Sequence, residues 1–209
     1  MTDKSYHHGD LKNALIQAGI ELLARDGVHA LSLRKVAARA GVSHAAPYSH
    51  FADKQGLIAA ISTEGYRKVQ VRVEAVWAAN QQDALKLLVR TAWAYVQFAL
   101  QEPDHFKITF SGVVEKEKSY PALVEAAHHS FSLLVQVVDR CQAQGFLRPG
   151  PSELTAVAVW GAIHGFVTLI LEGQVSRAIT ERYTWQQMLV FVLAEMTLAP
   201  IPADILDED

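Results

Sequence analysis

The sequence predicts an all-α protein of about nine helices. Apolar residues recur every three to four positions along most of the chain, which is the period of an amphipathic helix. The alternating apolar and polar runs of strands are absent, and Gly, Pro or short polar segments separate the periodic stretches. Half of the 209 residues are apolar, so we expect a folded protein with a sizeable core rather than a disordered or fibrous one.

The first predicted helix runs from Asp10, which is suited to the N-cap position, to Arg25. Gly27 follows at the position where a left-handed residue commonly ends a helix. One apolar stripe runs along this helix and consists of Leu11, Leu15, Ala18, Leu22 and Leu23. A helix with a single apolar stripe requires a partner to cover it, and the next helices along the chain are the natural candidates.

The most specific pattern in the chain is a pair of short helices joined by a tight turn. The first helix is expected over residues 33–40 after Ser32 as N-cap, and the second over residues 44–51 after Ser43 as N-cap. The three residues between them match the spacing of a helix-turn-helix, with Gly41 supplying the backbone freedom that the turn needs. Spacing alone also fits an ordinary helical hairpin in a bundle.

The rest of the chain continues as helices with clear boundaries. Asp53 precedes a long helix, Ser152 is the expected N-cap of another, and Thr184 with Gln187 forms a capping-box pattern. These further helices are expected at about residues 54–77, 84–100, 104–110, 121–145, 152–172 and 184–199.

The net charge of −3 hides an uneven distribution. Residues 1–72 carry ten Lys and Arg against six Asp and Glu, whereas residues 73–209 carry nine against sixteen. A basic end on an acidic body is expected of a module that binds a polyanion, although chance clustering of surface charge gives the same counts. The first ten residues are polar, so we expect no signal peptide, and the single Cys141 suits a reducing, cytoplasmic compartment.

Several other classes of protein are not expected. The sequence has no Gly-rich phosphate loop, no His-Glu-x-x-His or Gly-x-Ser-x-Gly motif and no visible pair of carboxylates, so we expect no enzyme and nominate no catalytic residue. We also expect no metal, because the adjacent His128 and His129 point to different faces of a helix and cannot bind one ion together. No cofactor is expected either. Residues 154–171 are long and uncharged enough to raise the question of a membrane span, but the absence of flanking Lys or Arg favours a buried helix and no membrane.

A resemblance to the TetR repressor family runs without a gap over residues 8–60. The DNA-binding signature of that family is similar to residues 33–54, which read LRKVAARAGVSHAAPYSHFADK. Further on, residues 160–165 (Trp-Gly-Ala-Ile-His-Gly) resemble the Trp…His-Gly, or WHG, signature of one TetR-type C-terminal domain. The resemblance implies a three-helix DNA-binding domain over residues 1–55, with the helix at about 54–78 as a link. It also implies a helical ligand-binding and dimerisation domain over residues 56–200 and a flexible tail over 201–209.

The resemblance makes residues 44–51 a recognition helix that enters the major groove. Base edges are expected to face His44, Ala45 and Ala46, since a hydrogen-bonding ring and methyl groups can both read them. Phosphates are expected to bind Ser32, Ser43, Tyr48, His50 and Lys54. Arg34 is expected either near the groove or simply solvated, and Phe51 is expected to pack the recognition helix onto the first helix. Pro47 departs from the bulky apolar residue common in the family, so we expect a bent or late-starting helix.

The resemblance also assigns roles in the C-terminal domain. The expected walls of an effector pocket are Trp93, Phe98, Phe106, Phe110, His128, Phe131, Trp160 and His164, although each of them could equally be an ordinary core residue. The expected dimer interface contains Gly161, Gly165, Trp185, Met188, Val192 and Met196. Two apolar stripes on one soluble chain imply a partner, and an identical chain is the default.

The resemblance therefore implies a homodimeric DNA-binding transcriptional regulator. We expect a repressor that binds a palindromic operator in double-stranded DNA and is released by a small, largely apolar effector. The alternative is a helical small-molecule-binding protein that has lost specific DNA reading. Loss of the basic and Tyr/Lys positions would favour that alternative, and those positions are present here.

Overall fold

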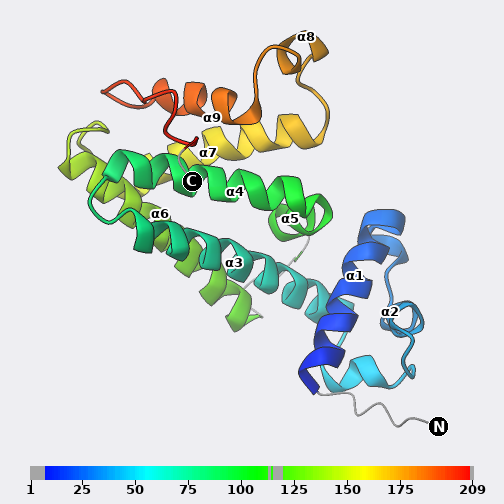
Figure 1. The fold of residues 1–209 in the computed structure, drawn as a ribbon. Helices are drawn as coiled ribbons and strands as arrows, with labels where there is room; N and C mark the ends of the chain where they lie inside the picture. The colour runs from blue at the N-terminus through cyan, green and yellow to red at the C-terminus, as the bar shows by residue number, and fades with distance from the viewer. Residues whose placement is uncertain (1–7, 113, 115–119, 208–209) are drawn as a thin grey trace. The chain divides into compact units, whose positions relative to one another are not determined.

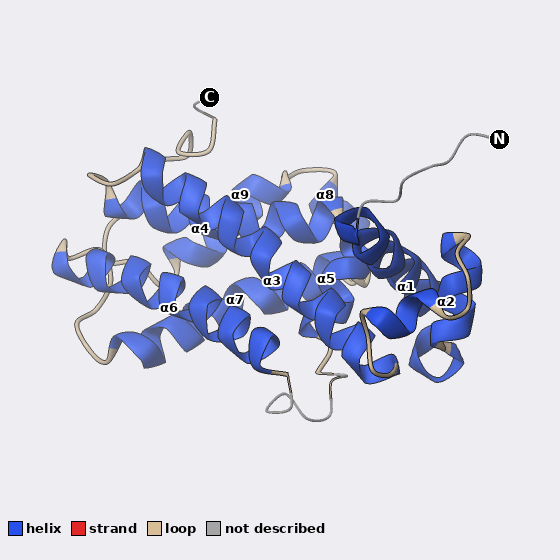
Figure 2. Cartoon of the chain, turned by 90° about the horizontal axis from the view of Figure 1, so that it is seen from below, coloured by secondary structure: helices blue, strands red, loops and turns tan. Residues whose placement is uncertain are grey.

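The computed structural model describes residues 8–112, 114 and 120–207, and the side chains of these except residues 8–10. Expectations about residues 1–7 and 208–209 lie outside that range. The described residues are helical and contain no strand, as the sequence predicts (Figures 1 and 2). In chain order the elements are α1 (His8–Ala30), α2 (Leu33–Ala40), the 3₁₀ helix η1 (Ala46–Ser49), α3 (Lys54–Ala79), α4 (Ala84–Gln101), α5 (Pro103–Phe110), α6 (Pro121–Ala143), α7 (Ser152–Leu171), α8 (Arg177–Thr180) and α9 (Trp185–Ala194).

The chain forms two compact units, which we describe separately. The head unit contains Met1–Tyr66 and Asp104–Ala127, and the body unit contains Arg67–Pro103 and His128–Asp209. The head unit thus includes α5 and the start of α6 as well as the N-terminal helices. The division into functional domains at residue 55 stays a prediction.

The head unit has one apolar core. Leu15 of α1, Val36 of α2 and Leu57 of α3 are completely buried in it, and Phe51 is 3% exposed. Burying one such side chain stabilises the fold by about 1.5–3 kcal/mol. The core also contains Val114 and Leu123 of α6 (Pro121–Ala143), so the N-terminal helices share their core with a later part of the chain. The predicted structural role of Phe51 agrees with this burial.

Helix α5 approaches α3 closely within the head unit. The Nε2 atom of the buried His105 lies 2.8 Å from the carbonyl oxygen of Ile61. Four residues further along each helix, Thr109 occupies the space beside Gly65, where a Cβ atom would lie 1.9 Å from the Thr109 hydroxyl. Any larger residue at position 65 would therefore force these two helices apart.

The body unit packs α4, α7 and α9 against one another (Figure 1). The predicted capping box is confirmed, since Thr184 Oγ1 accepts from the Gln187 backbone N–H and the Gln187 side chain accepts from the Thr184 N–H. The predicted N-cap role of Ser152 is wrong. Pro151 holds the N-cap position, and the Ser152 hydroxyl instead donates 2.8 Å to Gln142 Oε1.

The C-terminal part of the body unit differs from the prediction in two ways. The four-residue helix α8 was not expected, because one turn is too short to show a helical period. Helix α9 ends at Ala194 rather than near residue 199, since the Leu198 N–H bonds to the carbonyl of Phe146 and draws the chain away from the helix axis. Ile205 is buried, and the flexible tail over residues 201–209 stays a prediction.

Candidate functional site

The first helix of the helix-turn-helix has both of its predicted caps. Ser32 has extended backbone geometry and its Oγ accepts from the Lys35 backbone N–H at 3.3 Å. Gly41 has a φ of 70°, in the left-handed region, and its N–H bonds to carbonyls of the last turn of α2. Ala37 is fully buried, as expected where two helices approach. The local sequence therefore sets the direction in which the chain leaves α2.

The recognition element is a short 3₁₀ helix, not the α-helix predicted over residues 44–51. It begins at Ala46, and Ser43 makes no side-chain cap: its carbonyl accepts from the Ala46 N–H at 3.0 Å instead. Pro47 explains the change, because it has no N–H to bond to the Ser43 carbonyl, as an α-helix would require. The Tyr48 N–H then bonds to the Ala45 carbonyl in the 3₁₀ pattern. The expectation of a late-starting helix is confirmed.

The surface around η1 presents donors and methyl groups. His44 and Ala45 are exposed, Ala46 is half-buried, and Tyr48 is 58% exposed although it is aromatic. Arg34, on α2, is exposed as well. Within the described residues, the side chains of Arg34, His44 and Tyr48 have no hydrogen bond or ion pair. These groups are available to a partner without breaking contacts inside the head.

Lys54 and His50 are less free than the sequence suggests. Lys54 opens α3 next to Asp53, whose carboxylate caps the helix by accepting from the Gly56 N–H at 2.8 Å. The Lys54 ammonium group donates to the Val28 carbonyl at 3.2 Å and has two further protons for other acceptors. The Nε2 atom of His50 is buried without a hydrogen-bond partner among the described residues. His50 must therefore turn its ring, or use its other nitrogen, to contact a phosphate.

Two other cations of α2 are held by the head itself. Lys35 donates to the Ala30 carbonyl at 2.9 Å. Arg39 donates through Nε to the carboxylate of Glu21 on α1, at 2.6 Å. Of the three cationic side chains on α2, only that of Arg34 thus has no hydrogen bond or ion pair within the described residues.

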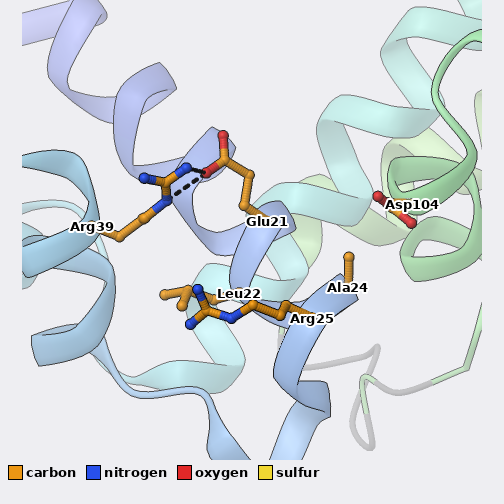
Figure 3. A pocket seen from close by; sticks show the side chains of 6 residues that line it. All are labelled: Glu21, Leu22, Ala24, Arg25, Arg39 and Asp104. Atoms are coloured by element: carbon orange, nitrogen blue, oxygen red, sulfur yellow. Dashed lines mark hydrogen bonds and ion pairs between the residues drawn. The ribbon is translucent and has the colours of Figure 1, made fainter.

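A surface pocket of about 440 Å³ lies in the head unit, between α1, α2 and α5 (Figure 3). The Glu21–Arg39 pair forms one side of it, and Asp104 of α5 lies on the other (Figure 3). Its lining residues are Glu21, Leu22, Ala24, Arg25, Arg39 and Asp104. Four of these six are charged, so this pocket is unlike the apolar effector pocket that the sequence predicts. Sequence reasoning missed it, because Asp104 lies far along the chain from α1.

The residues predicted to wall an effector pocket are divided between the two units. Phe106 and Phe110 belong to the head unit, with ring centroids 4.8 Å apart. The other six belong to the body unit: Trp93, Phe98, His128, Phe131, Trp160 and His164. Phe98 is completely buried, whereas His128 is exposed on α6. The pocket itself stays a prediction.

Three polar side chains meet between α4 and α7 in the body unit. The Trp160 indole N–H donates to the hydroxyl oxygen of Tyr95 at 3.2 Å, and that hydroxyl lies 2.8 Å from Nδ1 of His164. Tyr95 is buried, and the other two are half-buried. Burial lowers the pKa of His164, which favours its neutral form. Trp160 and His164 are among the residues predicted from the sequence, whereas Tyr95, which is 69 residues from its histidine partner, is not.

Helix α7 exposes an apolar face. The predicted Gly161 and Gly165 are both exposed, and a Cβ atom at either position would have nothing within 4 Å. Leu154 (68% exposed), Val157 and Leu169 lie on the same side of the helix, at positions −7, −4 and +8 from Gly161. Sequence reasoning missed these three, although this register could have found them.

The predicted residues Trp185, Met188 and Val192 of α9 are half-buried, as is Met196 in the turn after it, while Phe191 of α9 is 67% exposed. Helix α7 is long and apolar enough to cross a membrane, and 28% of that stretch is buried within the chain. Length and composition alone do not separate a membrane span from a helix that packs against a partner.

A helix-turn-helix with exposed donors, joined to a helical body, defines a DNA-binding transcriptional regulator. Residues 15–61 match the family model for bacterial regulatory proteins of the tetR family, and residues 88–192 match the tetracyclin repressor-like C-terminal domain. The chain belongs to the TetR family of transcriptional regulators.

Solved structures of bacterial proteins resemble the chain. One is a Rhodococcus protein of unknown function that is 30% identical; the alignment covers 93% of this chain and 99% of that one, with a TM-score of 0.73. A Rhodococcus regulatory protein of the tetR family is 21% identical, with 90% and 98% covered and a TM-score of 0.70. The fatty acid degradation regulator FadR of Bacillus halodurans is 16% identical, with 89% and 94% covered and a TM-score of 0.69. No curated protein sequence matches the chain.

Proposed function

We propose that the protein is a cytoplasmic, homodimeric repressor that binds a palindromic operator and releases it when a small, largely apolar effector binds. The observation that carries DNA binding is the exposure of Arg34, His44 and Tyr48, whose side chains have no hydrogen bond or ion pair within the described residues. The basic composition of residues 1–72 supports the same conclusion, because cations there offset the charge of the DNA backbone.

In this proposal the phosphates bind at the ends of two helices. Ser32 uses its oxygen to cap α2 and keeps its hydroxyl proton for a phosphate. Lys54, at the start of α3, binds the same strand. Ser43, Tyr48 and His50 supply further contacts, whereas His44, Ala45 and Ala46 read base edges.

The second copy is proposed to cover the apolar face of α7. Leu154, Val157 and Leu169 are each at least half exposed in the single chain, and the glycines between them let another helix approach closely. Pairing of two such faces brings two heads together, as a palindromic site requires. The same cover would account for the apolarity of α7 without a membrane. Helix α9 and the turn after it would extend the interface through Trp185, Met188, Val192 and Met196.

The proposal is tested by measuring binding to DNA from upstream of the protein's own gene. Fluorescence anisotropy at several salt concentrations should show tighter binding to an inverted repeat in this DNA than to random DNA of equal length. Lys54→Ala should weaken binding to both DNAs. It should also reduce, by about one, the slope of the logarithm of the binding constant against the logarithm of the salt concentration. Arg182→Ala, which removes an exposed charge from the body unit, is the matched control and should change neither.

Equal binding to both DNAs would contradict the proposal and favour the alternative, a helical ligand-binding protein that no longer reads DNA. The effector is sought separately with a thermal-shift screen, since a ligand that binds only the native state raises the unfolding temperature. A ligand found in this way should also release the operator. No catalytic role forms part of the proposal.

A further inference from the structure

We infer that Tyr95 is a positioning residue for dimerisation: through Trp160 and His164 it holds the exposed face of α7 in the register that a second copy recognises. This inference rests on the proposed homodimer. It concerns a residue outside the dimer face itself, on α4, which packs against α7. It explains why three polar side chains gather beside an otherwise apolar face.

The three side chains form a chain of hydrogen bonds with one direction. The indole N–H of Trp160 can only donate, so the Tyr95 oxygen accepts from it. The Tyr95 oxygen has a second lone pair, so the tautomer of His164 decides the direction of the 2.8 Å contact with Nδ1, and we assign the single hydroxyl proton of Tyr95 to this contact. Nδ1 must be unprotonated to accept it, so the neutral imidazole carries its proton on Nε2. The lowered pKa of His164 agrees with a neutral ring.

The geometry of α7 connects this chain of bonds to the exposed face. His164 directly precedes Gly165 and lies three residues after Gly161, so it flanks the glycine notch on the same helix. Trp160 lies one turn earlier on the same flank. Two side chains of α7 are thus bonded to one hydroxyl of α4, which limits both rotation and sliding of α7. A close helix–helix contact through glycines tolerates little of either.

The test compares Tyr95→Phe with the wild-type full chain. The variant keeps the ring and removes only the hydroxyl, which leaves two polar groups without this partner. We expect the dimer dissociation constant, measured by sedimentation velocity over a dilution series, to rise about tenfold. Nitrogen-15 chemical shifts of His164 should also change from the Nε2–H form of the wild type to a mixture of tautomers.

Two further variants separate positioning from general loss of stability. Val137→Ala removes buried methyl groups from α6 and should lower the unfolding temperature without changing the dissociation constant. His164→Asn keeps an acceptor near the position of Nδ1 and should pair more tightly than His164→Leu, which has none. An equal effect of Asn and Leu, or weakened pairing in Val137→Ala, would count against positioning.

The outcomes keep this inference apart from the proposed function. A wild-type chain that remains monomeric at all concentrations contradicts the homodimer itself. A dimeric wild type with an equally tight Tyr95→Phe dimer overturns the role of Tyr95 and leaves the homodimer in place. An Nδ1–H tautomer of His164 in the wild type overturns the assigned direction of the hydrogen bonds.

Discussion

Replacing Gly161 with alanine is expected to stabilise one chain while weakening the pairing of two. Within a single chain, the added methyl group has nothing within 4 Å, and the residue lies inside the regular helix α7. Alanine favours a helix interior by about 1 kcal/mol over glycine. The unfolding free energy of the monomer should therefore rise by about 1 kcal/mol.

In the dimer the same methyl group occupies the notch through which the second helix approaches. Each partner adds one, and overpacking at a close contact costs about 1–3 kcal/mol. Since 1.4 kcal/mol corresponds to a factor of ten, the dissociation constant should rise about tenfold or more. Opposite signs for folding and pairing are the signature of an interface residue.

Sedimentation velocity over a dilution series measures the pairing, and urea unfolding at the lowest concentration measures the fold of the single chain. Gly56→Ala is the control, because a Cβ atom there makes only an ordinary 3.6 Å contact with Asp53 and lies in α3. It should leave the dissociation constant unchanged. A Gly161→Ala dimer as tight as the wild type would refute the assignment of the α7 face to the interface.

Three other outcomes follow from the structure. Gly65→Ala should destabilise the fold by about 1–3 kcal/mol in urea unfolding despite the better helix propensity of alanine, because its Cβ would lie 1.9 Å from the Thr109 hydroxyl. Adding Thr109→Ala should restore part of this loss, and additive losses in the double variant would contradict the predicted clash. Ser32→Ala should lower the unfolding free energy by about 1 kcal/mol through loss of the α2 cap, and an unchanged urea midpoint would count against the capping bond. Burial raises the pKa of Cys141 to about 12 from 9.0, so its thiol should resist labelling in the native state at pH 8. The stability due to the neutral thiol should be present below pH 9 and lost as the pH rises towards 12. Fast labelling of the folded protein would refute the burial of this thiol.

The parts of the fold that could be predicted are those set by local sequence. Ser32, Gly41 and the Thr184–Gln187 pair mark helix ends, because caps depend on residues within one turn of one another. The 3₁₀ form of the recognition element was harder to predict. A proline in the first turn of a helix is usually tolerated, and the outcome at Pro47 depends on how the burial of its ring competes with the missing hydrogen bond.

The parts of the candidate site that could not be predicted depend on contacts between distant residues. No local pattern marks Tyr95 as the partner of Trp160 and His164, since it is one aromatic residue among many on an apolar helix. The charged pocket beside Glu21 likewise needs Asp104 from a different part of the chain. The extent of the α7 face is a different case, because Leu154 and its neighbours follow the helical period from Gly161 and were available to sequence reasoning.

The two heads of one dimer are proposed to bind DNA together. The most direct measurement is the number of chains bound to one inverted repeat from upstream DNA, determined by native mass spectrometry or sedimentation at moderate salt. Two chains per repeat (or a multiple of two) are expected, and the Gly161→Ala variant should require a higher protein concentration to reach the same state. A single chain bound with full affinity, or no binding stronger than to random DNA, would contradict this proposal.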